Sequence, residues 1–164
     1  MENSLKKASK AVCLSVVEAT GAACIPFAAV RIPILTKITS SMSDKVIAAY
    51  GYQSIMGLAN FLSIAAGACA GVTLANEILE HMKCIPGINV AATTAAALST
   101  AALHCITGAF LICACELMKK GKITDKELQN TAFCKSLCAN WMKNAGNIVL
   151  KVIRGYNPVE LAYI

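Results

Sequence analysis

Two long stretches without charged residues dominate the pattern of polar and apolar positions. Residues 46–76 and 84–115 contain no Asp, Glu, Lys or Arg, and a short polar spacer, 77–83, separates them. Each stretch exceeds the roughly 20 residues that a helix needs to span a bilayer core. Both are rich in Ala, Gly, Ser and Thr, which allow close helix–helix approach in lipid and also suit a tightly packed soluble bundle. The pattern therefore predicts a pair of close-packing apolar helices.

Helical spacing and helix-stop residues predict the remaining elements. Val12 and Val16 lie one turn apart in the first helix, and Pro26 and Pro33 predict a turn or a broken helix after it. Further helices are expected at about 34–50, 53–83, 89–120, 124–146 and 148–154. No segment alternates with the period of a strand. The predicted fold class is all-α: a bundle of five to six helices around the two apolar ones, which could form a transmembrane hairpin.

Local stop and start signals divide the chain into three parts. Gly121 follows a basic last turn, and Thr124 and Glu127 have the spacing of a capping box. We therefore expect a basic N-terminal tail (1–10), an apolar helical core domain (11–123) and an amphipathic C-terminal helical segment (124–164).

The distribution of basic residues suggests a membrane orientation. The net charge is +6; all Lys and Arg lie outside the two uncharged stretches, and only Lys83 lies in the spacer between them. If both stretches span a membrane, positive-inside bias places both termini in the cytoplasm. The alternative localisation is wholly cytoplasmic. Lys119, Lys120 and Lys122 are the candidate membrane-surface or partner-binding residues. Nucleic acid is not expected as a partner, because no aromatic stacking platform accompanies the basic residues.

Small and polar residues inside the apolar helices are the other candidates for a role. Gly67 and Gly71 have the four-residue spacing of a helix-packing seam, and Gly108 is a third candidate packing position. His104 is an ionisable residue in an apolar helix, so an interhelical or intramembrane polar role is expected, with Glu18 as its candidate partner.

Enzyme chemistry is not indicated by the sequence. The nine cysteines are interpreted as small buried residues, and neither their spacing nor that of the two histidines indicates a metal site. Glu116 stands where a phosphate-binding loop before Gly121-Lys122 would need glycine. We therefore expect no catalytic residue, no metal and no cofactor.

Several short motifs resemble a known family. They are Ile25-Pro26-Phe27-Ala28, Ile47-Ala48-Ala49-Tyr50-Gly51, Ile85-Pro86-Gly87-Ile88-Asn89 and Cys115-Glu116-Leu117-Met118-Lys119-Lys120-Gly121-Lys122. Together they resemble the YcjF-like uncharacterised helical domain associated with GTPases, over residues 12 to 123. The resemblance implies an α-helical domain with a GTPase as its first candidate partner. The family usually has an acidic residue just after the Pro-Phe turn, whereas this chain has Ala28, Ala29 and Val30.

Three functional hypotheses follow. The first is a non-enzymatic, membrane-associated helical module that docks on or in a bilayer and recruits or regulates a partner, for which a GTPase is the first candidate. The second is a soluble helical bundle that acts as an interaction or structural protein. The third is a pore formed by a homo-oligomer, with the small residues and His104 at a helical seam.

Overall fold

A computed structural model describes residues 2–69 and 95–162. Helices account for most of this part of the chain, and it contains no strand, so the all-α prediction is confirmed. The helices are α1 (Glu2–Ala23), α2 (Ala28–Ala49), α3 (Leu58–Cys69), α6 (Ala95–Lys119), α7 (Asp125–Gln129), α8 (Thr131–Met142) and α9 (Ala145–Ile153), followed by a 3-10 turn, η1 (Val159–Leu161).

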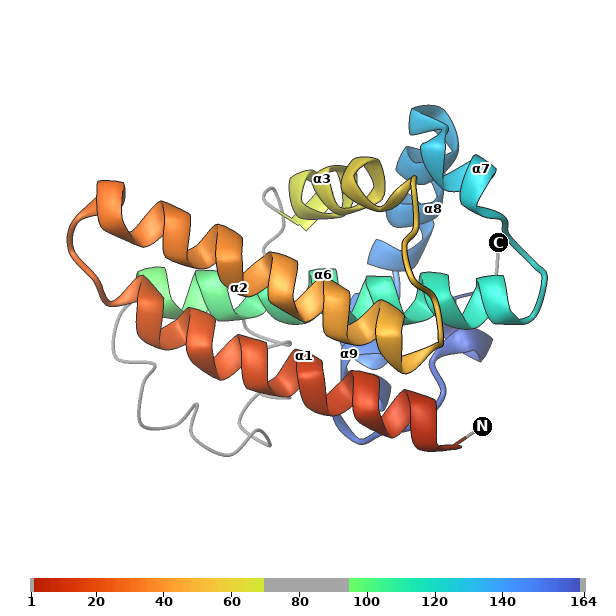
Figure 1. Cartoon of the computed structure of the whole chain (residues 1–164), viewed down its shortest axis with the longest axis horizontal. Helices are drawn as coiled ribbons and strands as arrows, with labels where there is room; N and C mark the ends of the chain where they lie inside the picture. Colours follow the sequence, from red (N-terminus) through yellow and green to blue (C-terminus); the bar gives the residue numbers. More distant parts are fainter. Residues whose placement is uncertain (1, 70–94, 163–164) are drawn as a thin grey trace.

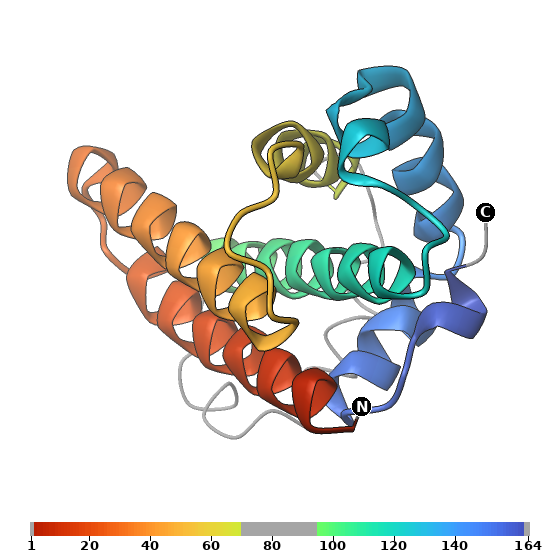
Figure 2. The same cartoon turned by 45° about the vertical axis from the view of Figure 1, so that its right-hand side comes forward.

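Helix α6 is the central element of the bundle. It packs against α1 and α2 on one side and against α3 and α9 on others (Figures 1 and 2). All side chains from 104 to 117 are buried. A helix that is apolar all round has no face suited to water, and this one is covered by its neighbours.

Helix α6 is also the one described segment that bears on whether the chain could span a membrane. Among the described residues one helix, Ser99–Lys119, is long and apolar enough to cross a bilayer, and 89% of its most apolar window is buried inside the bundle. The other uncharged stretch is interrupted where it is described, because α2 ends at Ala49 and α3 begins at Leu58. The described residues thus show one helix of this kind and not the expected pair.

Two helices begin at positions that differ from the predicted ones. Helix α2 starts at Ala28 and runs through Pro33, although the proline was expected to precede the helix. Pro33 lies less than two turns inside the helix, and it is exposed. Water can therefore bond the carbonyl group that lacks its usual donor, and this lowers the cost of the proline. Helix α3 starts at Leu58 instead of 53, after a loop closed by the Asp125 carboxylate, which accepts hydrogen bonds from the amides of Met56 and Gly57.

The helix predicted over 124–146 is divided into α7 and α8. The expected capping box is present, with Thr124 and Glu127 bonded to each other's backbone amides. Asn130 then adopts an extended conformation and accepts hydrogen bonds from the amides of Ala132 and Phe133. A short amide side chain that caps a new helix competes with continuation of the old one, which explains the break.

A second part of the core holds the C-terminal helices against α3 and α6. The buried Trp141 of α8 makes edge-to-face contacts with Phe61 of α3 and Phe110 of α6, at centroid distances of 6.1 and 5.4 Å. Its indole N–H donates to the carbonyl of Ala162 at 2.9 Å. These contacts join α8 to α3 and α6 and hold Ala162 against α8.

Candidate functional site

The glycines expected at packing positions differ in their surroundings. Gly108 faces α1 and α2, where an added β-carbon would lie 2.7 Å from Cγ1 of Val12 and 3.0 Å from Sδ of Met42. Gly67 is exposed, and a β-carbon there would have no described atom within 4 Å, so the packing role expected for Gly67 stays a prediction. Its proposed partner Gly71 lies outside the described residues.

His104 makes contacts that join two helices. Its Nε2 lies 2.9 Å from Oγ1 of Thr39 in α2, and its Nδ1 lies 3.0 Å from the carbonyl oxygen of Thr100. Burial lowers the pKa of His104 below its ordinary value, and backbone hydrogen bonds oppose this effect in part. Glu18 is exposed on α1 and is not a hydrogen-bond partner of His104, so the expected pairing is wrong.

The three lysines selected from the sequence lie at the C-terminal end of α6 and just after it. Lys119, Lys120 and Lys122 are exposed, and the ammonium group of Lys119 lies 5.7 Å from the ring centroid of Tyr50. Gly121, with φ of 66°, ends the helix, and the amide of Lys122 donates to the carbonyl of Leu117 at 2.9 Å. This left-handed cap turns the basic segment away from the helix axis.

An exposed apolar surface lies at the opposite end of the bundle, where α1 connects to α2 (Figures 1 and 2). We call it the α1–α2 tip and define it by Phe27, Val30, Ile32 and Ile34, which are 70%, 50%, 59% and 36% exposed. The first buried residue of α2 is Met42, so its first turns stand clear of the core. Residues 19–43 contain Arg31 and Lys37 but no Asp or Glu. The tip is therefore apolar and basic.

A buried carboxylate occupies the other end of the bundle. Glu116, in the last turn of α6, is 5% exposed. Its Oε1 accepts a hydrogen bond from the hydroxyl of Tyr50 at 2.8 Å, and its Oε2 accepts one from Nδ2 of Asn157 at 3.1 Å. Burial, together with the carboxylate of Glu116, raises the pKa of Tyr50 above its ordinary value, so the phenol remains a neutral donor. This network ties the end of α2 and the turn after α9 to α6.

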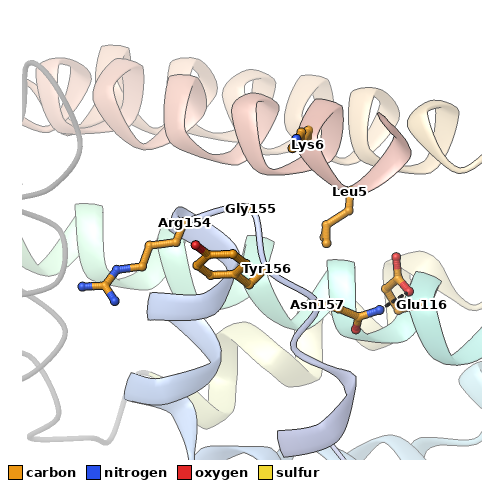
Figure 3. A pocket seen from close by; sticks show the side chains of 7 residues that line it. All are labelled: Leu5, Lys6, Glu116, Arg154, Gly155, Tyr156 and Asn157. Atoms are coloured by element: carbon orange, nitrogen blue, oxygen red, sulfur yellow. Dashed lines mark hydrogen bonds between the residues drawn. The ribbon is translucent and has the colours of Figure 1, made fainter. Parts of the chain in front are cut away.

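A pocket of about 640 Å³ opens beside this carboxylate (Figure 3). The first turns of α1 contribute Lys6, and the turn that follows α9 contributes Arg154, Tyr156 and Asn157. The ring of Tyr156 lies between the Arg154 side chain and Glu116 in this view, and 64% of the tyrosine is exposed. Glu116, Lys6 and Arg154 all line the pocket, and the guanidinium group of Arg154 points away from Glu116 (Figure 3).

Sequence reasoning did not select the tip or the pocket. In the sequence, Phe27 and Val30 belong to a proline turn, Phe27 also belongs to a motif of the family resemblance, and Glu116 belongs to another of these motifs and excludes a phosphate-binding loop. The alternation of apolar residues with Arg31 around two prolines was the available signal for the tip. The pocket had none, because its residues come from three distant segments of the chain.

Comparisons with protein-family models, with curated proteins and with solved structures find no match for this chain. The resemblance to the YcjF-like family and the GTPase partner that it implies therefore remain predictions.

Proposed function

We propose that this protein is a non-enzymatic membrane-surface module whose α1–α2 tip inserts into the headgroup region of an anionic bilayer. The observation that carries the proposal is the exposure of three large apolar side chains beside basic residues. Phe27, Val30 and Ile32 are each at least half exposed, and no acidic residue occurs between positions 19 and 43. Water is a poor environment for such a surface, whereas a bilayer interface accepts apolar and basic side chains together.

The expected strength of this docking is modest. Complete burial of a Phe, Val or Ile side chain contributes about 1.5–3 kcal/mol, and these side chains are already partly covered. Arg31 and Lys37 add about 1 kcal/mol each near anionic lipid. The tip alone therefore supports reversible binding, which suits a module that exchanges between the bilayer and solution.

The geometry of the bundle also separates the membrane from the partner surface. The described ends of the chain and the C-terminal end of α6 lie away from the tip (Figure 1). When the tip is inserted, Lys120 and Lys122 face the aqueous side, and so do the described ends of the chain. We assign these two lysines to partner recruitment, for which a GTPase is the first candidate by resemblance.

A second candidate, a soluble interaction or structural bundle, is favoured by the burial of α6. Within the bundle, 89% of the most apolar window of α6 is buried. The apolar side chains of α6 are therefore shielded from water without lipid. A transmembrane hairpin, or a pore built from it, would require α6 to leave these neighbours. Docking through the tip leaves the bundle intact, and we therefore prefer it to insertion of α6.

Flotation with liposomes tests the proposal. The full chain should float with vesicles that contain phosphatidylserine and should bind neutral phosphatidylcholine vesicles much more weakly. The double variant Phe27→Ser/Ile32→Ser should reduce binding by about tenfold or more, because it removes most of the inserted apolar area. The matched control is Met56→Ser, since Met56 is 78% exposed but lies outside the tip.

Two results would contradict the proposal. One is a wild-type chain that stays with the unbound protein at every lipid concentration, which would favour the soluble bundle. The other is equal loss of binding in Met56→Ser and in the tip variant. Extraction only by detergent, with protection of α6 from added protease, would indicate that the helix itself inserts.

A further inference from the structure

Tyr156 is an exposed aromatic residue whose backbone is held by the end of α9. The tyrosine is 64% exposed. Gly155, with φ of 72°, ends the helix, and the amides of Gly155 and Tyr156 donate to the carbonyls of Val152 and Lys151 at 2.9 and 2.8 Å. These two hydrogen bonds form a Schellman motif. The motif fixes the backbone of Tyr156, while most of its side chain lies in water.

Arg154 and Tyr156 form a wall that two pockets share. One is the pocket of about 640 Å³ beside Glu116. The second, of about 360 Å³, lies along one face of α9 and extends to η1. Arg154 and Tyr156 are the described residues that line both pockets. In the second pocket the half-buried Leu150 and Leu161 provide the apolar walls. We call Leu150, Arg154, Tyr156 and Leu161 the Tyr156 surface.

The Tyr156 surface carries one uncompensated positive charge. At its edge Lys151 is paired with Glu160 at 3.2 Å, so that lysine is already neutralised. The side chain of Arg154 makes no hydrogen bond or ion pair in the part of the chain that the structure describes. Its guanidinium group points away from Glu116 (Figure 3), so an anion bound there does not face the buried carboxylate. The surface therefore complements an apolar group that has an anion beside it.

A peptide segment suits this combination. Arginine binds carboxylates through two parallel hydrogen bonds. Tyr and Arg are among the residues that contribute most binding energy in protein interfaces. In an extended segment neighbouring side chains point to opposite sides, so an apolar side chain can enter the second pocket while an acidic neighbour reaches Arg154. The fixed backbone of Tyr156 also reduces the entropy that is lost on binding.

We propose that the Tyr156 surface docks an acidic peptide segment of a partner protein, with an apolar side chain between Leu150 and Leu161 and a flanking carboxylate on Arg154. This surface lies at the end of the bundle away from the α1–α2 tip (Figures 1 and 2). It stays in water whether or not the tip is inserted in a bilayer. The inference does not depend on the proposed docking of the tip.

A proton–nitrogen NMR titration of the full chain without lipid tests the proposal. The probe is the peptide acetyl-Glu-Asp-Leu-Asp-Glu-amide, which should shift the amide signals of residues 150–161 with a Kd of about 1 mM or tighter. One control peptide has serine in place of leucine, and the other has Gln and Asn in place of Glu and Asp. Each should bind at least about tenfold more weakly, because it lacks the apolar side chain or the charges. Absence of saturable shifts in 150–161, or equal affinity for the serine peptide, would overturn the proposal.

Variants at exposed positions locate the binding. Arg154→Gln and Tyr156→Ser should each weaken binding of the peptide by about tenfold. Lys126→Gln and Met56→Ser are the matched controls, since both residues are exposed and neither lines the two pockets. If a control variant weakens binding as much as its counterpart does, the peptide binds elsewhere and the assignment is wrong.

An anionic lipid surface is the alternative occupant, and a competition experiment separates it from a peptide. Phosphatidylserine vesicles are added to the variant Phe27→Ser/Ile32→Ser, in which the tip is altered, after saturation with fluorescein-labelled peptide. Retention of the peptide supports the assignment to a protein partner. Release of the peptide would assign the Tyr156 surface to lipid and contradict the proposal. Neither outcome depends on whether the wild-type tip binds a bilayer.

Discussion

Gly108 of α6 lies so close to Val12 of α1 that a β-carbon at Gly108 would be 2.7 Å from Cγ1 of Val12. The central helix therefore packs directly against the side chain of its neighbour at this point. Real β-carbons do not approach other atoms so closely, and the buried surroundings leave Val12 little room to move.

Gly108→Ala should lower the free energy of unfolding. Overpacking of a filled core costs about 1–3 kcal/mol, which exceeds the gain of roughly 1 kcal/mol from a better helix former. Gly67→Ala is the matched control: it has the same helix-propensity gain with no described atom within 4 Å of the new carbon, and it should be neutral or stabilising. Urea titration of both variants measures the difference. Equal stabilities would contradict the close packing at Gly108.

The pH dependence of stability should depend on His104. Burial lowers its pKa in the folded chain below the unfolded value of about 6.5. Below that value the unfolded chain binds a proton that the folded chain resists, so stability falls as the pH decreases, by at most about 1.4 kcal/mol per pH unit. His104→Gln should show a shallower decrease between about pH 7 and 5 when compared with the wild type. Parallel stability profiles would show that His104 does not contribute.

Tyr50→Phe should destabilise the chain because it removes one donor from a buried carboxylate. A hydrogen bond to a charged group contributes about 1.5–3 kcal/mol, and partial exposure of Tyr50 places the expected loss near the lower value. Tyr52→Phe is the control, since no hydrogen bond involves the Tyr52 hydroxyl within the described residues; a change below about 0.5 kcal/mol is expected. Thermal unfolding at neutral pH compares the two variants. A similar loss in both would exclude a specific role for the bond between Tyr50 and Glu116.

Gly57→Ala should be more damaging than an ordinary glycine substitution. A β-carbon there would lie 2.5 Å from the backbone carbonyl carbon of Leu128, and backbone atoms cannot move aside without shifting α7. We expect a loss of about 3 kcal/mol, at the upper end for overpacking. Gly21→Ala, where the new carbon meets no described atom within 4 Å, serves as the control. Near-ultraviolet circular dichroism of Trp141, which contacts Phe61 in the first turn of α3, would report the displacement.

The all-helical class could be predicted because periodicity and local signals act within a few residues of each other. The cap at Thr124 and the stop at Gly121 occur where the sequence places them. The start of α2 could not be predicted from Pro33, because the cost of a proline depends on whether water reaches the unbonded carbonyl. The break at Asn130 was missed for a related reason: an asparagine either tolerates a helix or caps a new one, and the docking of Asn60 against the Leu128 carbonyl favours the second.

By itself the sequence determined that this chain forms helices, that residues 46–76 and 84–115 are apolar and uncharged, and that the charged residues lie outside these two stretches. Only the tertiary structure decided what covers α6. An apolar helix can be buried either in the hydrocarbon core of a bilayer or among the apolar faces of neighbouring helices, and its sequence pattern is the same in both cases. The tertiary structure also decided that Phe27, Val30 and Ile32 remain exposed while the apolar side chains of α6 from Cys105 to Leu117 are buried. The meeting of Lys6, Glu116 and Arg154 around one pocket likewise depends on contacts between residues far apart in the chain, which no local pattern encodes.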